Sequence, residues 1–292
     1  MFEGFARKRI KTSGAEIELV QGGSGPPLLL VHGYPQTHVM WHKVAPRLAE
    51  RFTVIVPDLR GYGASSKPAT DAEHLTYSKR AMALDLIEAM DALGFGRFDI
   101  AGHDRGGRVT YRLALDHGAR VRRAAVLDII PTIEQFERMD RGSARRAFHW
   151  YFLAQPAPFP EKLIGNDPDY FLEHSLNSWC GTPRAFTPEA LEAYREAFRD
   201  PGVIHASCED YRAGIACDCQ FDEADRAAGR RIKSPMLVLW GAEGRPRGGG
   251  GITAIWKSWA DQVDGHPIAC GHFIPEEAPD VTTEKLLAFF GQ

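Results

Sequence analysis

The stretch IAGHDRGGR, residues 100–108, has the features of a strand end, a tight turn and the start of a helix. Within it, Asp104 stands between Gly102 and Gly106, which is the nucleophile-elbow pattern G-x-S-x-G with Asp in place of Ser. Glycine is needed in such a turn because the backbone passes close to itself and a Cβ would clash. The turn lifts the central side chain to a helix N-terminus, where free N–H groups and the helix dipole favour a carboxylate. We therefore predict that Asp104 is a nucleophile; an aspartate that only caps the helix is the alternative.

Apolar runs on either side of this turn predict a parallel sheet. Short continuous apolar runs are typical of strands that are buried on both faces. Such runs occur at residues 26–33, 52–58, 98–104, 121–129, 235–241 and 265–273. Residues 15–23 alternate between polar and apolar instead, which predicts an antiparallel edge strand. Helical patterns lie between the runs, at residues 78–94, 106–118 and 277–291, so we expect an α/β fold with helices on both faces of the sheet.

The segment at residues 131–232 breaks this alternation. It is rich in Trp, Phe, Tyr and Arg and has helical patterns, for example at residues 143–153 and 190–198. We interpret it as a helical cap inserted between two strands of the sheet, with residues 1–130 and 233–292 forming the core. The glycine-rich run at residues 244–251 predicts a loop.

Composition and charge exclude several classes of protein. The 292 residues, 44% hydrophobic and 25% charged, fit one globular α/β enzyme with an insertion. A net charge of −3 gives no general attraction to nucleic acid or to an anionic membrane. No apolar run approaches the roughly 20 residues that cross a bilayer, and residues 1–16 lack the features of a secretory signal. The five cysteines have no paired zinc spacing, so we expect free thiols in a reducing cytoplasm.

The ends of other predicted strands carry the remaining parts of a catalytic set. The loop that contains His32 and Tyr34 follows the first buried run, Asp128 ends the strand after the elbow, and His272 follows the last strand. Nucleophile, acid and histidine thus follow one another in the order that is typical of α/β-hydrolases. We therefore predict the α/β-hydrolase fold, with Asp104, Asp128 and His272 as its catalytic residues.

The acid that orients His272 has two candidates. Many α/β-hydrolases carry it in a W-G-x-x-D pattern after the strand that follows the cap, and this position falls on Gly244 here. Glu243 is one residue away, and in a tight turn we expect its side chain to point elsewhere. We therefore prefer Asp128; its alternative role is to cap the turn that follows it.

At this point the chain resembles the fluoroacetate dehalogenases, α/β-hydrolases that process haloacetates. The resemblance covers nearly the whole chain and is carried by residues 32–65, GHDRGGR (102–108), LDIIPT (127–132), FHWYFLAQP (148–156), EDYRA (209–213) and GHFIPEEAP (271–279). The GHDRGGR motif with a downstream His-Trp pair is specific to this family, whereas the HG and GHF pieces are shared across the superfamily. The loop PRGGGGI (246–252) departs from the family pattern.

The resemblance implies that Arg105 and Arg108 bind the carboxylate of a haloacetate. This assignment is physically reasonable, because a substrate carboxylate beside Asp104 needs cations to offset the repulsion between the two anions. Arginine suits the task since its planar guanidinium pairs with a carboxylate through two hydrogen bonds and stays charged. The alternative is that the two arginines lie in a solvated first turn of the helix, where a cation opposes the helix dipole.

The resemblance also implies a halide site and a mechanism. His149, Trp150 and Tyr211 each have an N–H or O–H that can donate to the departing halide; ordinary packing in the cap is their alternative role. Asp104 is expected to displace halide and form an ester. His272, held by Asp128, then activates water to hydrolyse that ester. The backbone N–H groups of Tyr34 and Arg105 are expected to stabilise the oxyanion.

The predicted enzyme is therefore a haloacetate dehalogenase that needs no metal and no organic cofactor. We expect a small haloacid substrate, no nucleic-acid or membrane partner, a homodimer and a cytoplasmic location. An epoxide hydrolase would use the same catalytic set with Tyr151 and Tyr211 as proton donors, but an uncharged epoxide needs no arginines. A haloalkane dehalogenase usually has Trp where Arg105 stands. A non-catalytic receptor for a small acid would not need the intact catalytic set.

Overall fold

The computed structural model describes residues 1–243 and 251–292, and among them an eight-stranded, mostly parallel sheet forms the centre of the molecule. The strand order is β1-β2-β4-β3-β5-β6-β7-β8, and pairing is parallel from β4 to β8. The strands are β1 (Ala6–Lys11), β2 (Glu16–Gly22), β3 (Pro27–Val31), β4 (Thr53–Pro57), β5 (Phe98–His103), β6 (Val121–Leu127), β7 (Met236–Gly241) and β8 (Val263–Ile268). The predicted α/β architecture is confirmed, and each of the predicted apolar runs overlaps one of these strands.

The antiparallel end of the sheet differs from the prediction in one respect. Strand β2 is antiparallel to β4, as its alternating pattern predicts, but it is not the edge, because β1 pairs with its other side. The sequence of β1, ARKRIK, gives no apolar signal, because nearly all of its residues are exposed. Charged side chains on an outer strand also discourage pairing with a further strand from another molecule.

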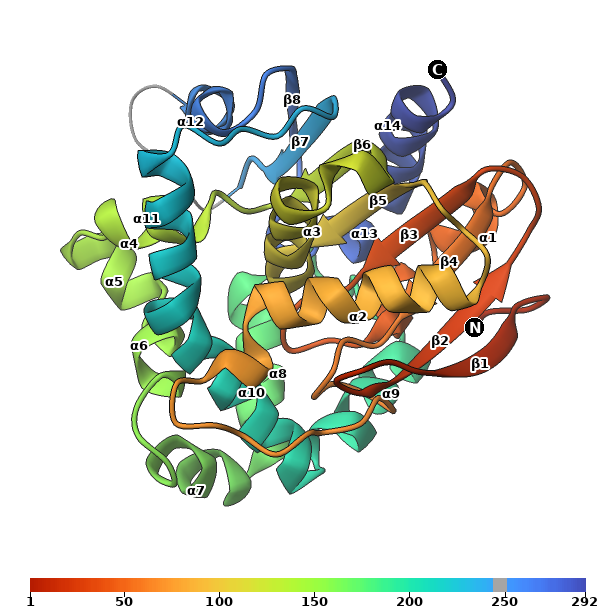
Figure 1. Ribbon diagram of the computed structural model, residues 1–292. Helices are drawn as coiled ribbons and strands as arrows, with labels where there is room; N and C mark the ends of the chain where they lie inside the picture. Colours follow the sequence, from red (N-terminus) through yellow and green to blue (C-terminus); the bar gives the residue numbers. More distant parts are fainter. Residues whose placement is uncertain (244–250) are drawn as a thin grey trace.

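Helices cover both faces of the sheet (Figure 1). Helices α2 (Lys79–Ala92) and α3 (Asp104–Asp116) pack against each other on one face, and α1 (Ala45–Leu48) and α14 (Pro279–Phe290) lie together on the other. Helix α12 (Gly251–Trp259) packs against β7 and β8. The remaining short elements outside the insertion are η1 (His38–Trp41), η2 (Leu75–Tyr77), η3 (Gly118–Arg120) and α13 (Ile274–Glu277).

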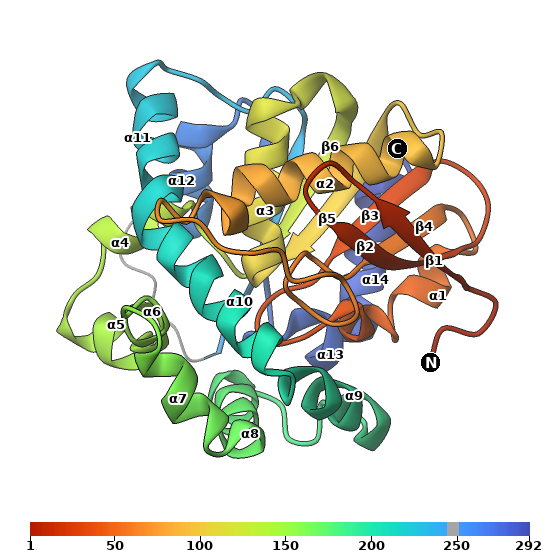
Figure 2. The same ribbon diagram turned by 60° about the horizontal axis from the view of Figure 1, so that its bottom comes forward.

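The segment between β6 and β7 is helical, and in Figure 2 its helices extend down the left side of the molecule and along its bottom. These helices are α4 (Thr132–Glu137), α5 (Arg141–Arg146), α6 (His149–Leu153), α7 (Phe159–Gly165), α8 (Pro168–Trp179), α9 (Pro188–Phe198), α10 (Pro201–Ala213), the π-helical turn η4 (Gly214–Asp218) and α11 (Cys219–Ala227). The predicted helix at residues 143–153 is in fact two helices, α5 and α6. Helix α5 begins with a capping box formed by Asp140 and Ser143 and ends before Ala147.

The core of the molecule forms where the sheet meets its helices. Nearly all side chains of β3 to β7 are buried, in one continuous apolar cluster that extends into the helical segment through Trp150, Leu172 and Tyr211. All five cysteines are free thiols. Among the described residues, no helix has both the length and the apolar character that a membrane span requires.

Candidate active site

The elbow at the end of β5 has the backbone geometry that its glycines predict. Asp104 is the first residue of α3 and has a left-handed φ of 47°. A Cβ on Gly106 would meet the carbonyl oxygen of His32, and a Cβ on Gly102 would meet the carbonyl oxygen of Gly106. Only glycine fits such close backbone contacts, so the turn can form and hold Asp104 in its strained conformation.

The two carboxylate oxygens of Asp104 have different partners. The backbone N–H of Tyr34, from the loop after β3, donates to Oδ1 over 3.0 Å. Oδ2 lies 3.7 Å from Nε2 of His272. Burial by itself would raise the pKa of Asp104, but the neighbouring His272, His103 and arginines outweigh it and lower the pKa. The carboxylate is therefore kept ionised, as a nucleophile requires.

Asp128 is the carboxylate that contacts His272. Its Oδ2 lies 2.6 Å from Nδ1 of His272, and its Oδ1 accepts a hydrogen bond of 3.1 Å from the backbone N–H of Gly241. Asp128 follows β6 and also has a left-handed φ, of 55°. Glu243, the other acid considered, is exposed. Gly244, on which the W-G-x-x-D position falls, lies outside the described residues.

His103 supports the backbone of the histidine loop. Burial first and His272 second lower the pKa of His103 to about 4, so its ring is neutral near pH 7. Its Nε2 lies 2.7 Å from the carbonyl oxygen of His272. Because a carbonyl can only accept, this nitrogen carries the proton and donates it. This contact gives His103 a structural role.

The two predicted carboxylate-binding arginines differ in their surroundings. Arg105 is fully buried; its Nε and Nη2 bond to the carboxylate of Asp210 over 3.1 and 2.5 Å. Its guanidinium carbon lies 4.2 Å from the centre of the Tyr211 ring. Arg108 bonds instead to the backbone carbonyl of Ile130 over 3.0 Å and to the hydroxyl of Thr132 over 3.1 Å. Of these two arginines, only Arg108 lies in the lining of the cavity described next.

A cavity of about 280 Å³ is lined by most of the predicted site residues. Among the described residues, its lining consists of Asp104, Arg108, Asp128, Ile130, Gln135, Arg138, Asp140, Ser143, Arg146, Ala147, His149, Trp150, Trp179, Ile255 and His272. The predicted nucleophile, histidine and acid, one of the two predicted carboxylate-binding arginines and two of the three predicted halide donors thus share one space. No three His, Cys, Asp or Glu side chains of the described chain are grouped as metal ligands.

The three predicted halide donors lie against one another. The ring of Tyr211 is 5.7 Å from the rings of both His149 and Trp150, with near-perpendicular planes. Trp150 also lies beneath the guanidinium of Arg108, at 4.4 Å. Tyr211 is buried behind them, outside the described lining. Burial raises the pKa of Tyr211 well above its usual value, so its hydroxyl keeps its proton.

Trp179 and Asp210 belong to this site but were not predicted from the sequence. Trp179, at the end of α8, lines the cavity, and its ring lies 4.4 Å from His149 and 5.8 Å from His272. An aromatic residue in a helical segment carries no signal of such a position. Asp210, the partner of Arg105, directly precedes Tyr211 in the EDYRA motif, so its position beside a predicted site residue was the available signal.

Comparisons with known proteins agree with this geometry. The family model described as the α/β hydrolase fold matches residues 26–279. The chain belongs to the α/β hydrolases. A crystal structure of a protein from Nostoc sp PCC 7120 assigned to the α/β hydrolases has a TM-score of 0.97 and 49% identity, covering 99% of each chain.

Two curated relatives of this α/β hydrolase have named activities. Fluoroacetate dehalogenase from Burkholderia sp is 49% identical over 99% of this chain and 95% of its own. Soluble epoxide hydrolase from Corynebacterium sp. (strain C12) is 34% identical over 95% of this chain and 94% of its own. The resemblance to the fluoroacetate dehalogenases, which the sequence motifs indicate, is thereby confirmed.

Proposed function

We propose that this α/β hydrolase is a haloacetate dehalogenase, which converts fluoroacetate and other haloacetates to glycolate and halide. The observation that carries the proposal is the placement of Arg108 in the cavity that also contains Asp104 and His272. A buried guanidinium beside a nucleophilic carboxylate suits a substrate that is itself an anion. The 49% identity with fluoroacetate dehalogenase over nearly the whole chain supports the same reaction.

In the first step, Asp104 attacks the carbon that bears the halogen. Oδ1 already accepts the N–H of Tyr34, so Oδ2 is the oxygen placed to form the new carbon–oxygen bond. The carbon–halogen bond breaks as this bond forms, and the halide leaves with both electrons. His149, Trp150 and Tyr211 donate hydrogen bonds to the leaving halide, which matters most for the strongly hydrated fluoride. The product is an ester between Asp104 and the hydroxyacid skeleton.

In the second step, water hydrolyses the ester. Nε2 of His272 lies 3.7 Å from the attacked carboxyl group, and Asp128 holds the opposite ring nitrogen at 2.6 Å, so His272 is placed to take a proton from water. The ester carbonyl oxygen is then Oδ1. The backbone N–H of Tyr34, together with that of Arg105, stabilises the negative charge that develops on it.

An epoxide hydrolase remains the second candidate, because several curated relatives, at 34% identity and below, are named as epoxide hydrolases. Epoxide opening calls for tyrosine hydroxyls that protonate the epoxide oxygen. Tyr151, one of the two tyrosines considered, is 37% exposed and is absent from the described lining of the cavity, so the pair of tyrosine donors is incomplete. This arrangement weighs against epoxide opening.

Product analysis with purified enzyme tests the proposed reaction. Fluoroacetate, chloroacetate, bromoacetate, chloroacetamide and a terminal epoxide are supplied in parallel, and halide, glycolate and diol are measured. For each of the three acids we expect one halide to be released per glycolate formed. We expect little halide from the amide and no diol from the epoxide. Asp104→Asn should be inactive. Diol formation without halide release from any haloacetate would contradict the proposal.

We also propose that the protein is a cytoplasmic homodimer, whose subunits meet through the helical cap at residues 131–232. Supporting this, helices α6 to α8 and the residue before them expose large apolar side chains: Phe148, Tyr151, Phe159, Leu163 and Tyr170. Free cysteines are consistent with a reducing compartment. Light scattering that gives the mass of a monomer at micromolar concentration would contradict the dimer.

A further inference from the structure

Three buried arginines of α3 differ in how their charges are balanced. Arg105 is paired with Asp210, and Arg112 is paired with Asp222 at 2.8 Å and with Asp225. Arg108 lies between them in sequence and is 2% exposed, yet within the described part of the chain it forms no ion pair. Among the three arginines, Arg108 is therefore the one whose positive charge no described carboxylate balances, so that it can pair with an anionic ligand.

The hydrogen-bond partners of Arg108 are neutral. Its Nη1 donates to the carbonyl oxygen of Ile130 and to Oγ1 of Thr132, and its guanidinium lies against the ring of Trp150. Its Nε is buried without a hydrogen-bond partner among the described residues. Burial and the neighbouring Arg105 both lower the pKa of Arg108. An anion in the cavity would offset both effects.

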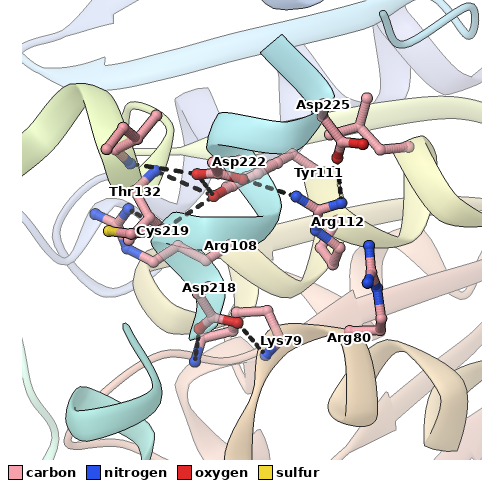
Figure 3. A network of polar contacts seen from close by, with 12 residues as sticks. Lys79, Arg80, Arg108, Tyr111, Arg112, Thr132, Asp218, Cys219, Asp222 and Asp225 are labelled. Atoms are coloured by element: carbon pink, nitrogen blue, oxygen red, sulfur yellow. Dashed lines mark hydrogen bonds and ion pairs between the residues drawn. The ribbon is translucent and has the colours of Figure 1, made fainter. Parts of the chain in front are cut away.

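The hydroxyl of Thr132 is in turn held by a chain of hydrogen bonds (Figure 3). The hydroxyl of Tyr111 lies 2.9 Å from Oγ1 of Thr132 and 2.8 Å from Oδ2 of Asp222, and it accepts the backbone N–H of Thr132 over 3.1 Å. Asp222 also accepts from the guanidinium of Arg112 and from the N–H of Ile133. The chain links α3, the start of α4 and α11 in one buried network.

The positions of the protons in this hydrogen-bonded network follow from the groups at its two ends, the carboxylate of Asp222 and the guanidinium of Arg108. Burial raises the pKa of Asp222, but its carboxylate accepts from Arg112 and from the N–H of Ile133, and the single proton of Tyr111 is best donated to that carboxylate. The proton of Thr132 then points to the oxygen of Tyr111. The lone pairs of Oγ1 are consequently left to accept from Arg108, and the threonine hydroxyl is fixed as an acceptor.

We propose that Thr132 is a positioning residue for Arg108 and thereby sets the preference of this enzyme for anionic substrates. Its hydroxyl fixes the guanidinium at the cavity through a neutral hydrogen bond, so that the positive charge stays available to a carboxylate. This inference rests on the proposed function, in which Arg108 binds the carboxylate of the substrate. Valine at this position would keep the shape and remove the acceptor.

The test compares Thr132→Val with Thr132→Ser, which keeps the hydroxyl. The matched control is Thr283→Val in α14; among the described residues, the Thr283 hydroxyl bonds to the carbonyl of Pro279 within the same helix. We measure kcat and KM for fluoroacetate, and inhibition by glycolate, which reports carboxylate binding without chemistry. Thermal unfolding of each variant identifies any general loss of structure.

We expect Thr132→Val to raise both the KM for fluoroacetate and the inhibition constant of glycolate by about tenfold, with kcat changed less. The KM and inhibition constants of Thr132→Ser and Thr283→Val should stay within about twofold of the wild-type values, since both variants keep a hydroxyl at position 132 that accepts from Arg108. Unchanged glycolate binding in a folded Thr132→Val would overturn the inference. If that variant does not fold, Tyr111→Phe decides: it removes the support of Thr132 and should raise the same two constants, and unchanged constants would overturn the inference.

The failure of the proposed function has a different signature. If wild-type enzyme releases no halide from any haloacetate, the proposed function is wrong. If wild-type enzyme is active and the Thr132 and Tyr111 variants bind glycolate normally, only the role of Thr132 is wrong.

Discussion

The indole of Trp150 lies among cations. The guanidinium carbons of Arg108 and Arg105 are 4.4 and 5.3 Å from the centre of its ring, and the ring of Tyr211 is 5.7 Å away. Cations held against an aromatic face contribute a positive potential in a buried space, where screening by water is weak. The surroundings of Trp150 thus favour an anion near its N–H group.

Replacing the indole tests whether Trp150 assists halide departure. Trp150→Phe keeps an aromatic ring and removes the N–H donor. Because fluoride needs more stabilisation than bromide as it leaves, we expect the ratio of fluoroacetate to bromoacetate turnover to fall by about tenfold. Trp259→Phe is the control, because this indole donates to Glu134 and is absent from the described lining of the cavity. An unchanged ratio would show that Trp150 only packs.

At the scale of elements, one carboxylate joins the helical segment to the histidine loop. Oε2 of Glu277 accepts the N–H groups of Gly181 and Gly271 over 2.8 and 2.9 Å, and Oε1 accepts that of Phe273 over 2.8 Å. The N–H of His272 donates to the carbonyl of Trp179 over 3.0 Å. The end of α8 and the loop that carries His272 are thus fixed to each other.

Loosening this connection should slow ester hydrolysis more than it slows halide release. Glu277→Gln places an amide group where the carboxylate accepted backbone N–H groups, so His272 loses part of its support. We expect ester hydrolysis to slow by up to about 100-fold, while the first halide is released at nearly the normal rate. Rapid-mixing experiments should show a burst of one halide per active site. Equal slowing of both phases would contradict this role; Asp280→Asn, on the neighbouring helix surface, is the control.

The residue patterns of the individual strands and loops explain which parts of the fold could be predicted from the sequence. The buried parallel strands are continuous apolar runs, and the elbow and His272 are marked by glycines, so both could be predicted. Strand β1 could not, because its exposed, charged residues have no apolar pattern. The partners of the site residues could not either: Asp210, Asp222 and Glu277 contact residues far away in sequence, and only the folded chain shows which carboxylate meets which cation.

At the scale of the whole molecule, a buried carboxyl group lies between the core and the inserted helices. The hydroxyl of Tyr194, on α9, donates to Glu276 over 2.5 Å, and Lys43 lies 3.2 Å from its other oxygen. Burial raises the pKa of Glu276 to about 7, and these two partners only partly oppose it. Its proton is therefore held more tightly in the folded chain than in the unfolded chain.

The stability of the fold should reflect this titration. A raised pKa stabilises the fold fully below about pH 4.5, the usual value for Glu, and that contribution is lost as the pH rises through about 7. The loss amounts to at most about 3 kcal/mol. We expect urea unfolding to show that wild type becomes less stable relative to Glu276→Gln between pH 5 and 8. A pH-independent difference between the two proteins would contradict the raised pKa.

The central claim is that Asp104 forms a covalent ester, and the source of one oxygen atom tests it most directly. In the alternative mechanism, Asp104 is a base that directs water at the carbon that bears the halogen. A single turnover of fluoroacetate is run with enzyme in excess in ¹⁸O-labelled water, and glycolate and the peptide that contains Asp104 are analysed by mass spectrometry. We predict that the new hydroxyl of glycolate carries ordinary oxygen and that the label enters Asp104. Labelled hydroxyl oxygen in the first glycolate formed, with unlabelled Asp104, would contradict the ester mechanism.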